Sequence, residues 1–207
     1  MIIELKAENE FRLTPEALEA AITPKTKLLV MPFPNNPTGA IMEKKDLEKI
    51  ADIVREHDLY VISDEIYSEL TYLERHVTIA SLQGMRDRTI VINGFSKSHA
   101  MTGWRLGYLI GPAEVIEGAR KVHDFLTVGA AAPLQEAAVA GLELPASYYK
   151  DLQALYTEKR DHFLAGLDRV GLKHNVPQGT YFVMIDISEF LALPQFEGWT
   201  DLEFCEW

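Results

Sequence analysis

Short apolar runs alternate with amphipathic segments along most of the chain. Continuous apolar runs bounded by polar or glycine-containing segments are typical of buried strands in a parallel sheet. We therefore expect strands at Lys27–Met31, Leu59–Ser63, Thr89–Asn93 and Leu106–Ile110. Because helical patterns lie between these runs, the sequence predicts an α/β fold, a three-layer sandwich around a mostly parallel central sheet.

The helices are predicted from apolar spacing and from capping residues. Leu47, Ile50 and Val54 recur at helical spacing, which indicates a helix over residues 44–57 with one buried stripe. Thr14-Pro15 is a favourable helix start, because threonine can cap the helix and proline fits its first position. Further helices are expected at Ala113–Leu126 and Pro133–Leu144.

A long helix is predicted from Ser147, as the N-cap, to Gly171, just beyond the C-terminal cap. Such a helix could connect two domains. Thr180–Ile187 is then predicted as a strand of a smaller unit, and Asp201–Trp207 as a helix. We expect residues 1–150 to belong to a large domain, and residues 151–207 to form the interdomain helix and the start of a small α+β C-terminal domain. The side chains expected to pack along the long helix are Tyr148, Tyr149, Leu152, Leu155, Tyr156, Phe163, Leu164, Leu167 and Val170.

The charge balance of the chain excludes some partners. The 207 residues include 20 basic and 31 acidic ones, for a net charge of -11, while 47% of the residues are hydrophobic. The chain is therefore long enough and apolar enough for a buried core. A surface this acidic is unsuited to nucleic acid or to an anionic membrane, so we expect neither as a partner.

Cysteine content and the first residues indicate where the protein works. Cys205 is the only cysteine, so no internal disulfide framework is possible, which fits a reducing compartment. Neither a leader pattern nor an apolar run of about 18 residues is present. We expect a cytoplasmic protein.

Three polar segments follow predicted strands: Pro34–Gly39, Ser63–Tyr67 and Asn93–Gly107. In an open α/β sheet, ligands bind at the carboxyl ends of the strands. Each segment alone has a simpler explanation. Asn36-Pro37-Thr38-Gly39 is a turn sequence, Asp64 could cap a strand end, and Lys97 and Arg105 could be solvated surface charges. Their joint order and spacing needs another explanation.

Together these segments resemble the fold-type I, class I/II aminotransferases, the aspartate and aromatic aminotransferase superfamily. The resemblance rests on Asn-Pro-Thr-Gly, on Ser-Asp-Glu-Ile-Tyr and on Ser-Lys-x-x-Ala-Met-Thr-Gly-Trp-Arg-Leu-Gly-Tyr, and it extends from Phe11 to Phe182. The segment with Lys97 is its most specific part. The resemblance implies that the fold is the large domain of a pyridoxal 5'-phosphate transferase, incomplete in this chain.

The resemblance also implies a role for each polar residue. Lys97 would hold the aldehyde cofactor as an imine and later serve as the base that moves a proton, which requires a lowered amine pKa. Asp64 would pair with the protonated ring nitrogen. Tyr67 and Asn36 would donate to the ring phenolate oxygen. The family holds its asparagine over the ring by a turn, so we expect the Asn36–Pro37 peptide bond to be cis.

The phosphate group of the cofactor is assigned to the same loop as the lysine. Arg105, eight residues after Lys97, would bind it through a planar guanidinium, and Ser96 would add a hydroxyl. One position departs from the pattern: some relatives have serine three residues before the lysine, where this chain has Gly94. The phosphate is therefore expected to depend more on Arg105 and on backbone amides.

The histidines do not suggest a metal. His57, His76, His99, His123, His162 and His174 are not spaced as ligands on one helix face, and we expect no metal site. His99 lies nearest to Lys97 and is interpreted as a loop histidine.

Several parts of a complete relative are expected to lie outside this chain. They are an upstream turn for the phosphate, an aromatic residue that stacks on the ring, a tyrosine given across a homodimer, and a downstream arginine for the substrate carboxylate. The chain therefore resembles an internal fragment, which alone could be inactive, and its remaining strands are expected to have an uncovered apolar face.

The predicted activity is transfer of an amino group between an amino acid and a 2-oxo acid. Two alternatives remain open at this point. One is different chemistry on the same fold, such as a carbon-sulfur lyase or a cyclopropane-carboxylate synthase. The other is a catalytically silent aminotransferase-like domain with a regulatory role.

Overall fold

The structure, a computed structural model, describes residues 1–73 and 75–207. Its centre is a four-stranded sheet in the order β1 (Leu28–Pro32), β2 (Tyr60–Asp64), β3 (Thr89–Gly94) and β4 (Gly107–Ile110). The first three strands are parallel, and β4 pairs antiparallel with β3. All four predicted strands are confirmed, each with bounds within one residue of the expected ones.

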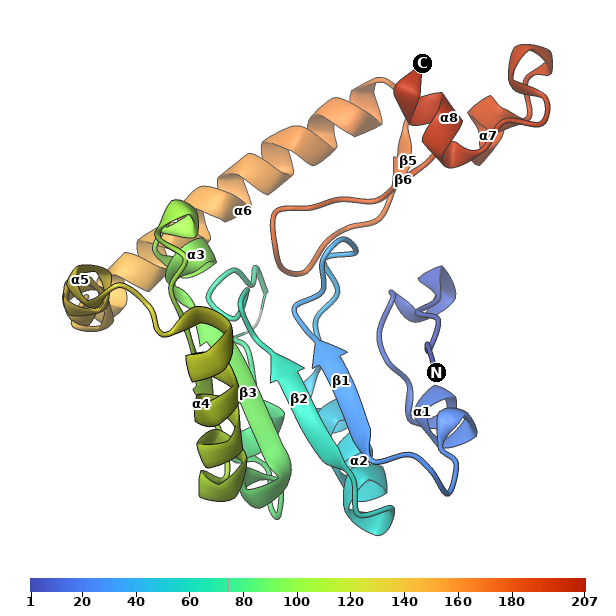
Figure 1. Cartoon of the computed structure of the whole chain (residues 1–207). Helices are drawn as coiled ribbons and strands as arrows, with labels where there is room; N and C mark the ends of the chain where they lie inside the picture. The colour runs from blue at the N-terminus through green and yellow to red at the C-terminus, as the bar shows by residue number, and fades with distance from the viewer. Residues whose placement is uncertain (74) are drawn as a thin grey trace.

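Helices cover both faces of this sheet. Helix α2 (Lys44–Glu56) lies behind β1 and β2, and α4 (Ala113–Thr127) lies on the opposite face (Figure 1). The long helix α6 (Ala146–Arg169) crosses beyond the carboxyl ends of the parallel strands (Figure 1). The remaining helices are α1 (Pro15–Ala21), α3 (Phe95–Ser98), α5 (Ala132–Leu142), α7 (Ser188–Leu191) and α8 (Asp201–Glu206). The 3-10 turns are η1 (Ala7–Asn9), η2 (Ile79–Ser81), η3 (Arg86–Arg88), η4 (Thr102–Trp104) and η5 (Pro194–Phe196).

The core lies between α2 and the sheet. The predicted stripe of α2 is buried, and Ile50 and Val54 are fully enclosed against Met31 and Val61 of the strands. Burying such side chains contributes roughly 1.5 to 3 kcal/mol each relative to exposure. At the start of α1, the Thr14 hydroxyl accepts a hydrogen bond from the Ala17 amide at 3.2 Å, as the capping pattern predicted.

The other sheet face retains the apolar exposure that the sequence led us to expect. Val30 is 58% exposed, and Leu28 and Tyr60 are nearly half exposed. These side chains alternate along β1 and β2 with the buried residues of the α2 side. The sheet is therefore packed fully on one face and partly on the other.

Two details of the C-terminal part differ from the sequence prediction. Helix α6 begins at Ala146 after Pro145, not at Ser147, because Pro145 occupies the N-cap position and Ser147 is already inside the helix. Gly171 does follow the helix end in the left-handed conformation, at φ +75°. The predicted strand Thr180–Ile187 was wrong over most of its length. Only β6 (Ile185–Asp186) forms, paired with β5 (Lys173–His174).

The residues before β6 form a turn because their backbone is bound elsewhere. Thr180 has φ +62°, and its amide donates to the Leu70 carbonyl at 2.8 Å. Gly179 forms an isolated bridge with Thr71. This turn joins the segment after α6 to the segment after β2.

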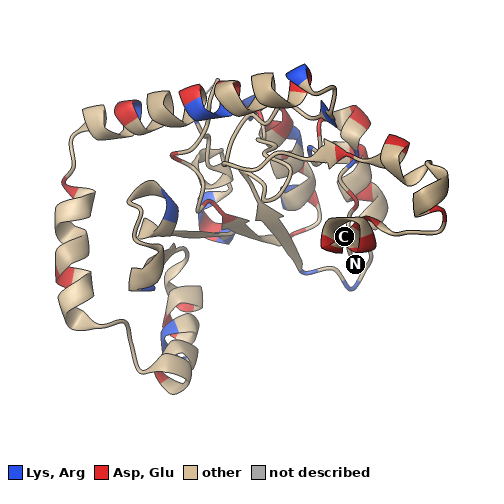
Figure 2. Ribbon diagram, turned by 90° about the horizontal axis from the view of Figure 1, so that it is seen from above, with Lys and Arg blue, Asp and Glu red and all other residues tan. Residues whose placement is uncertain are grey.

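The long helix buries less than its apolar pattern suggested. Leu164 and Leu167 are buried, whereas Phe163 is 52% and Val170 is 70% exposed. Acidic and basic residues are interspersed along α6 (Figure 2). None of the helices in residues 1–73 and 75–207 is long and apolar enough to cross a membrane.

Candidate cofactor site

The three polar segments meet because their strands are parallel neighbours in register. Pro32 at the end of β1 lies opposite Asp64 at the end of β2, and Asp64 lies opposite Ile92 of β3. The segments that follow these ends therefore leave the sheet at the same edge, below α6 (Figure 1).

Lys97 lies on a loop that is closed at its base. Gly94 of β3 pairs with Gly107 of β4, and the Phe95 amide donates to the Leu106 carbonyl at 3.3 Å. The twelve residues between them, 95–106, carry both Lys97 and Arg105. The antiparallel pairing of β4 thus explains why residues eight positions apart return to the same end of the sheet.

Gly94 is required by the close approach of the two strands. A Cβ atom at Gly94 would lie 2.9 Å from the Gly107 Cα atom and 2.9 Å from the Leu106 carbonyl oxygen. The backbone at Gly94 is extended, so the constraint is space and not conformation. This contact accounts for glycine at this position of the chain.

We expect Gly94→Ala to lower the free energy of unfolding by about 1 to 3 kcal/mol, because β3 and β4 must separate to accept the methyl group. Gly118→Ala is the matched control. Gly118 lies in the exposed middle of α4 with nothing within 4 Å of a Cβ atom, so alanine there should stabilise by roughly 0.5 to 1 kcal/mol. Denaturant unfolding of both variants measures the difference. Equal stability of the two variants would contradict the close approach.

The Lys97 amine contacts two tyrosines. Its Nζ atom donates to the Tyr181 hydroxyl at 2.9 Å and lies 5.6 Å from the centre of the Tyr67 ring. The Tyr67 hydroxyl in turn donates to the Tyr181 hydroxyl at 3.4 Å. Lys97 and Tyr67 are therefore joined through a third residue from the turn after α6.

The two hydroxyls differ in acidity. Burial, followed by the hydrogen bond to Tyr181, raises the pKa of Tyr67, against the opposing effect of the Asn36 amide. Burial also acts to raise the pKa of Tyr181, but the hydrogen bonds from Lys97 and Tyr67 outweigh it, and the net pKa is lowered. Tyr67 therefore keeps its proton and can act as a donor.

The turn after β1 positions Asn36. The Asn35 Oδ1 atom accepts a hydrogen bond from the Thr38 hydroxyl at 2.8 Å, and the Gly39 amide donates to the Asn35 carbonyl at 2.8 Å. Asn36 itself is exposed, and its side chain acts to lower the pKa of Tyr67. The Asn36–Pro37 peptide bond is cis, as predicted, and the Phe33–Pro34 bond is cis as well.

Asp64 is half-buried at the end of β2. Its Oδ1 atom accepts a hydrogen bond from the Ile66 amide at 3.2 Å. Within residues 1–73 and 75–207, Oδ2 has no hydrogen-bond partner. The carboxylate is thus held in place by one oxygen and can accept a hydrogen bond at the other.

Arg105 and Ser96 are linked to each other through Thr102. The Thr102 hydroxyl donates to the Ser96 carbonyl at 2.9 Å, and Arg105 Nη1 donates to the Thr102 carbonyl at 2.9 Å. Arg105 is exposed and has φ +55°, which turns the chain back into β4. Its other N–H groups make no hydrogen bond within the described part of the chain.

Tyr181 is the residue at this site that the sequence analysis missed. It lies in the Gly179-Thr180-Tyr181-Phe182 segment, which contributed to the resemblance but was assigned to a strand. The available signal was glycine and threonine before an aromatic pair, a sequence compatible with a turn.

His99 is more than a solvated loop residue. Its Nδ1 atom lies 2.7 Å from the Ser98 hydroxyl, and its Nε2 atom lies 3.1 Å from the Gly141 carbonyl of α5. Its ring stacks on Tyr148, and Tyr149 packs edge-on against it. These contacts fix the lysine loop against α5 and α6. No group of His, Cys, Asp and Glu suited to a metal ion occurs in the described residues.

Comparison with known proteins places this geometry in a family. The family model described as aminotransferase class I and II matches residues 1–206. A kynurenine–oxoglutarate transaminase 1 from Mus musculus is 36% identical over 217 residues, covering 99% of this chain and 51% of the relative. A bifunctional aspartate aminotransferase and glutamate/aspartate-prephenate aminotransferase from Petunia hybrida is 41% identical. The match covers 93% of this chain and 42% of that relative.

Solved structures of aminotransferases have a similar fold. The Thermus thermophilus aspartate aminotransferase with maleate superposes with a TM-score of 0.85 at 38% identity, covering 93% of this chain and 50% of that one. The chain belongs to the class I and II aminotransferases, whose members use pyridoxal 5'-phosphate. It spans about half the length of the relatives it matches.

The groups at the site fit that cofactor by their chemistry. The site offers an amine at Lys97, a carboxylate oxygen without a partner at Asp64, a protonated hydroxyl at Tyr67 and available N–H groups at Arg105. The Lys97 amine matches an aldehyde, and the Asp64 oxygen matches a protonated ring nitrogen. The Tyr67 hydroxyl matches a phenolate oxygen, and the Arg105 N–H groups match a phosphate. The donor set is therefore complementary to each polar part of the cofactor.

Proposed function

We propose that the protein is a pyridoxal 5'-phosphate-dependent aminotransferase that transfers an amino group from an amino acid to a 2-oxo acid. The observation that carries the proposal is that the Lys97 amine lies against the Tyr67 ring, at the sheet edge where β2 also ends in Asp64. Membership of the family supports it.

When bound, the cofactor supplies an aldehyde that condenses with amines and a ring that accepts electrons. Lys97 would provide the amine that holds it and, when released, the base that moves a proton. Asp64 would keep the ring nitrogen protonated through its available oxygen. Tyr67, with its raised pKa, would donate a hydrogen bond to the ring oxygen, and Asn36 would donate beside it.

Arg105 and Ser96 would bind the phosphate. One guanidinium nitrogen of Arg105 donates to the Thr102 carbonyl. The other N–H groups of the guanidinium would then bind an anion. The Ser96 hydroxyl lies one residue before Lys97, so the two would act on neighbouring parts of the same ligand.

We also propose the setting in which the site works. Residues 1–150 would form part of the cofactor-binding domain, and residues 151–207 the interdomain helix and the beginning of the small domain. The protein would be a cytoplasmic homodimer with a role in amino acid metabolism, including biosynthesis.

Reductive capture tests the proposed function. The purified chain is mixed with pyridoxal 5'-phosphate, reduced with borohydride and mapped by peptide mass. We expect Lys97 to be labelled at least about tenfold more efficiently than Lys121, which corresponds to about 1.4 kcal/mol of selective binding. Lys121 is 71% exposed on α4 and serves as the internal control. Equal labelling of both lysines would contradict the proposal.

A further inference from the structure

Successive residues at the end of β2 face opposite sides of the sheet. Val61, Ser63 and Glu65 are buried on one face. Ile62 and Asp64 are half-buried on the opposite face, from which Asp64 would reach the cofactor. Glu65 has only 4% of its surface exposed. A carboxylate buried this deeply directly beside Asp64 calls for a physical explanation.

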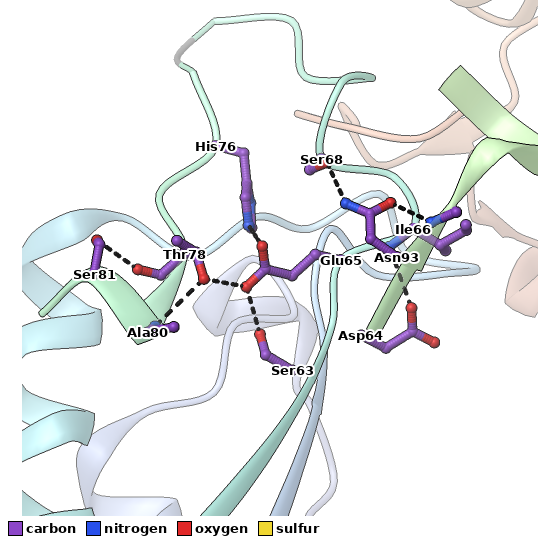
Figure 3. Close-up of polar contacts among 11 residues, drawn as sticks. Ser63, Asp64, Glu65, Ile66, Ser68, His76, Thr78, Ala80, Ser81 and Asn93 are labelled. Carbon is purple, nitrogen blue, oxygen red and sulfur yellow. Dashed lines mark hydrogen bonds and ion pairs between the residues drawn. The ribbon is translucent and has the colours of Figure 1, made fainter. Parts of the chain in front are cut away.

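Both carboxylate oxygens of Glu65 have partners (Figure 3). Oε1 accepts hydrogen bonds from the Ser63 hydroxyl at 2.9 Å and from the Thr78 hydroxyl at 2.5 Å. His76 Nε2 lies 3.0 Å from Oε2, within ion-pair distance, although its ring is not oriented for a hydrogen bond. The carboxylate is therefore hydrogen-bonded by Ser63 of the strand and by Thr78, and the His76 ring lies beside its second oxygen.

The backbone of Glu65 is fixed as well. Its amide donates to the Ile92 carbonyl of β3 at 2.8 Å, and its carbonyl accepts from the Ser68 amide at 2.8 Å. The second bond closes the turn that contains Tyr67. Asp64 accepts from the Ile66 amide in the same turn, so one short segment orients both cofactor-facing side chains.

The partners of Glu65 are anchored in the core. Thr78 caps η2 by accepting from the Ala80 amide at 3.3 Å, and the next residue, Ile79, is 1% exposed within the main core cluster. The Ser81 hydroxyl donates to the Thr78 carbonyl at 2.8 Å. A rigid element thus holds the far side of the Glu65 carboxylate (Figure 3).

We propose that Glu65 is a positioning residue for the cofactor ring, acting through Asp64 and Tyr67 without touching the ligand. Its carboxylate clamps the end of β2 to the segment of His76 and Thr78 on the reverse side of the sheet. This clamp sets the direction in which the Asp64 carboxylate and the Tyr67 hydroxyl project. The inference rests on the proposed function, since it names a residue that prepares the same site.

Reductive capture at Lys97 is measured against the concentration of pyridoxal 5'-phosphate, together with thermal unfolding and amide exchange without the cofactor. We expect Glu65→Ala to raise the half-saturating concentration by about tenfold, because small misplacements of binding groups have large effects. The Ile66 and Ser68 amides should exchange faster. Glu65→Gln, which retains an acceptor for Ser63 and Thr78, should restore most of the binding. Glu48→Ala, on the exposed face of α2, is the control.

Thr78→Val covers the case in which Glu65→Ala does not fold. It removes the donor to Glu65 and the cap on the Ala80 amide at nearly constant volume, while Thr78→Ser retains both. We expect weaker capture with valine and not with serine. Unchanged capture in the folded Glu65→Ala variant, or in Thr78→Val if alanine unfolds the chain, would overturn the positioning role. Absence of Lys97-selective capture in the wild-type chain would instead refute the proposed function and, with it, this inference.

Discussion

Replacing Lys97 with alanine is expected to abolish the visible absorbance of lysine-bound pyridoxal 5'-phosphate while leaving the fold nearly intact. Lys97 is half-buried, and its Nζ atom makes one hydrogen bond, to Tyr181, within the described part of the chain. Because Lys97 belongs to neither hydrophobic core cluster of the described residues, the free energy of unfolding should change by no more than about 1 kcal/mol. The cofactor, by contrast, would lose the Lys97 amine that is proposed to hold it.

Lys97→Arg separates the amine from its charge, and Lys121→Ala is the control. Lys97→Arg preserves a cation beside the Tyr67 ring but cannot condense with an aldehyde at neutral pH, so it too should lack the band. Lys121→Ala, which removes an exposed lysine of α4, should retain the band at wild-type intensity. Absorbance spectra of the three variants show whether the Lys97 amine is required for the band, and thermal unfolding shows whether each variant is folded. Persistence of the band in Lys97→Ala would exclude Lys97 as the attachment point.

The sequence predicted the strands and the large helices because their apolar patterns are local. The stripe of Leu47, Ile50 and Val54 is a property of one helix, and the structure buries all three residues. The placement of Asp64 at the same sheet edge as the lysine loop also followed from a general rule, since parallel strands bring their carboxyl ends to one edge. These parts required no knowledge of distant contacts.

The parts of the fold and of the site that the sequence did not predict depend on long-range contacts. Tyr181 reaches Lys97 from 84 positions away, through a turn that forms because Thr180 bonds to Leu70. The apolar sequence of Thr180–Ile187 suggested a strand, because pattern alone does not show where a backbone amide will find its partner. Glu65 was similarly hidden, since its burial becomes visible only when His76 and Thr78 fold back against it.

Asp64→Asn is expected to weaken cofactor binding strongly with little effect on the fold. The amide oxygen of asparagine can still accept the hydrogen bond from the Ile66 amide, so the end of β2 keeps its local structure. What is lost is the negative charge opposite the protonated ring nitrogen. A hydrogen bond to a charged group contributes about 1.5 to 3 kcal/mol. Half-burial of Asp64 leaves part of this interaction screened by water.

We therefore expect the half-saturating concentration for reductive capture at Lys97 to rise by roughly 10-fold, which corresponds to the lower end of that free-energy range. Asp58→Asn provides the control, because Asp58 has a side chain 93% exposed and pairs only with Arg88 within residues 1–73 and 75–207. It should bind like the wild-type chain. Because Asn and Asp have the same shape, equal capture by Asp64→Asn and wild type would mean that the charge at the end of β2 does not act on the ring. The partner of the ring nitrogen would then have to be another residue.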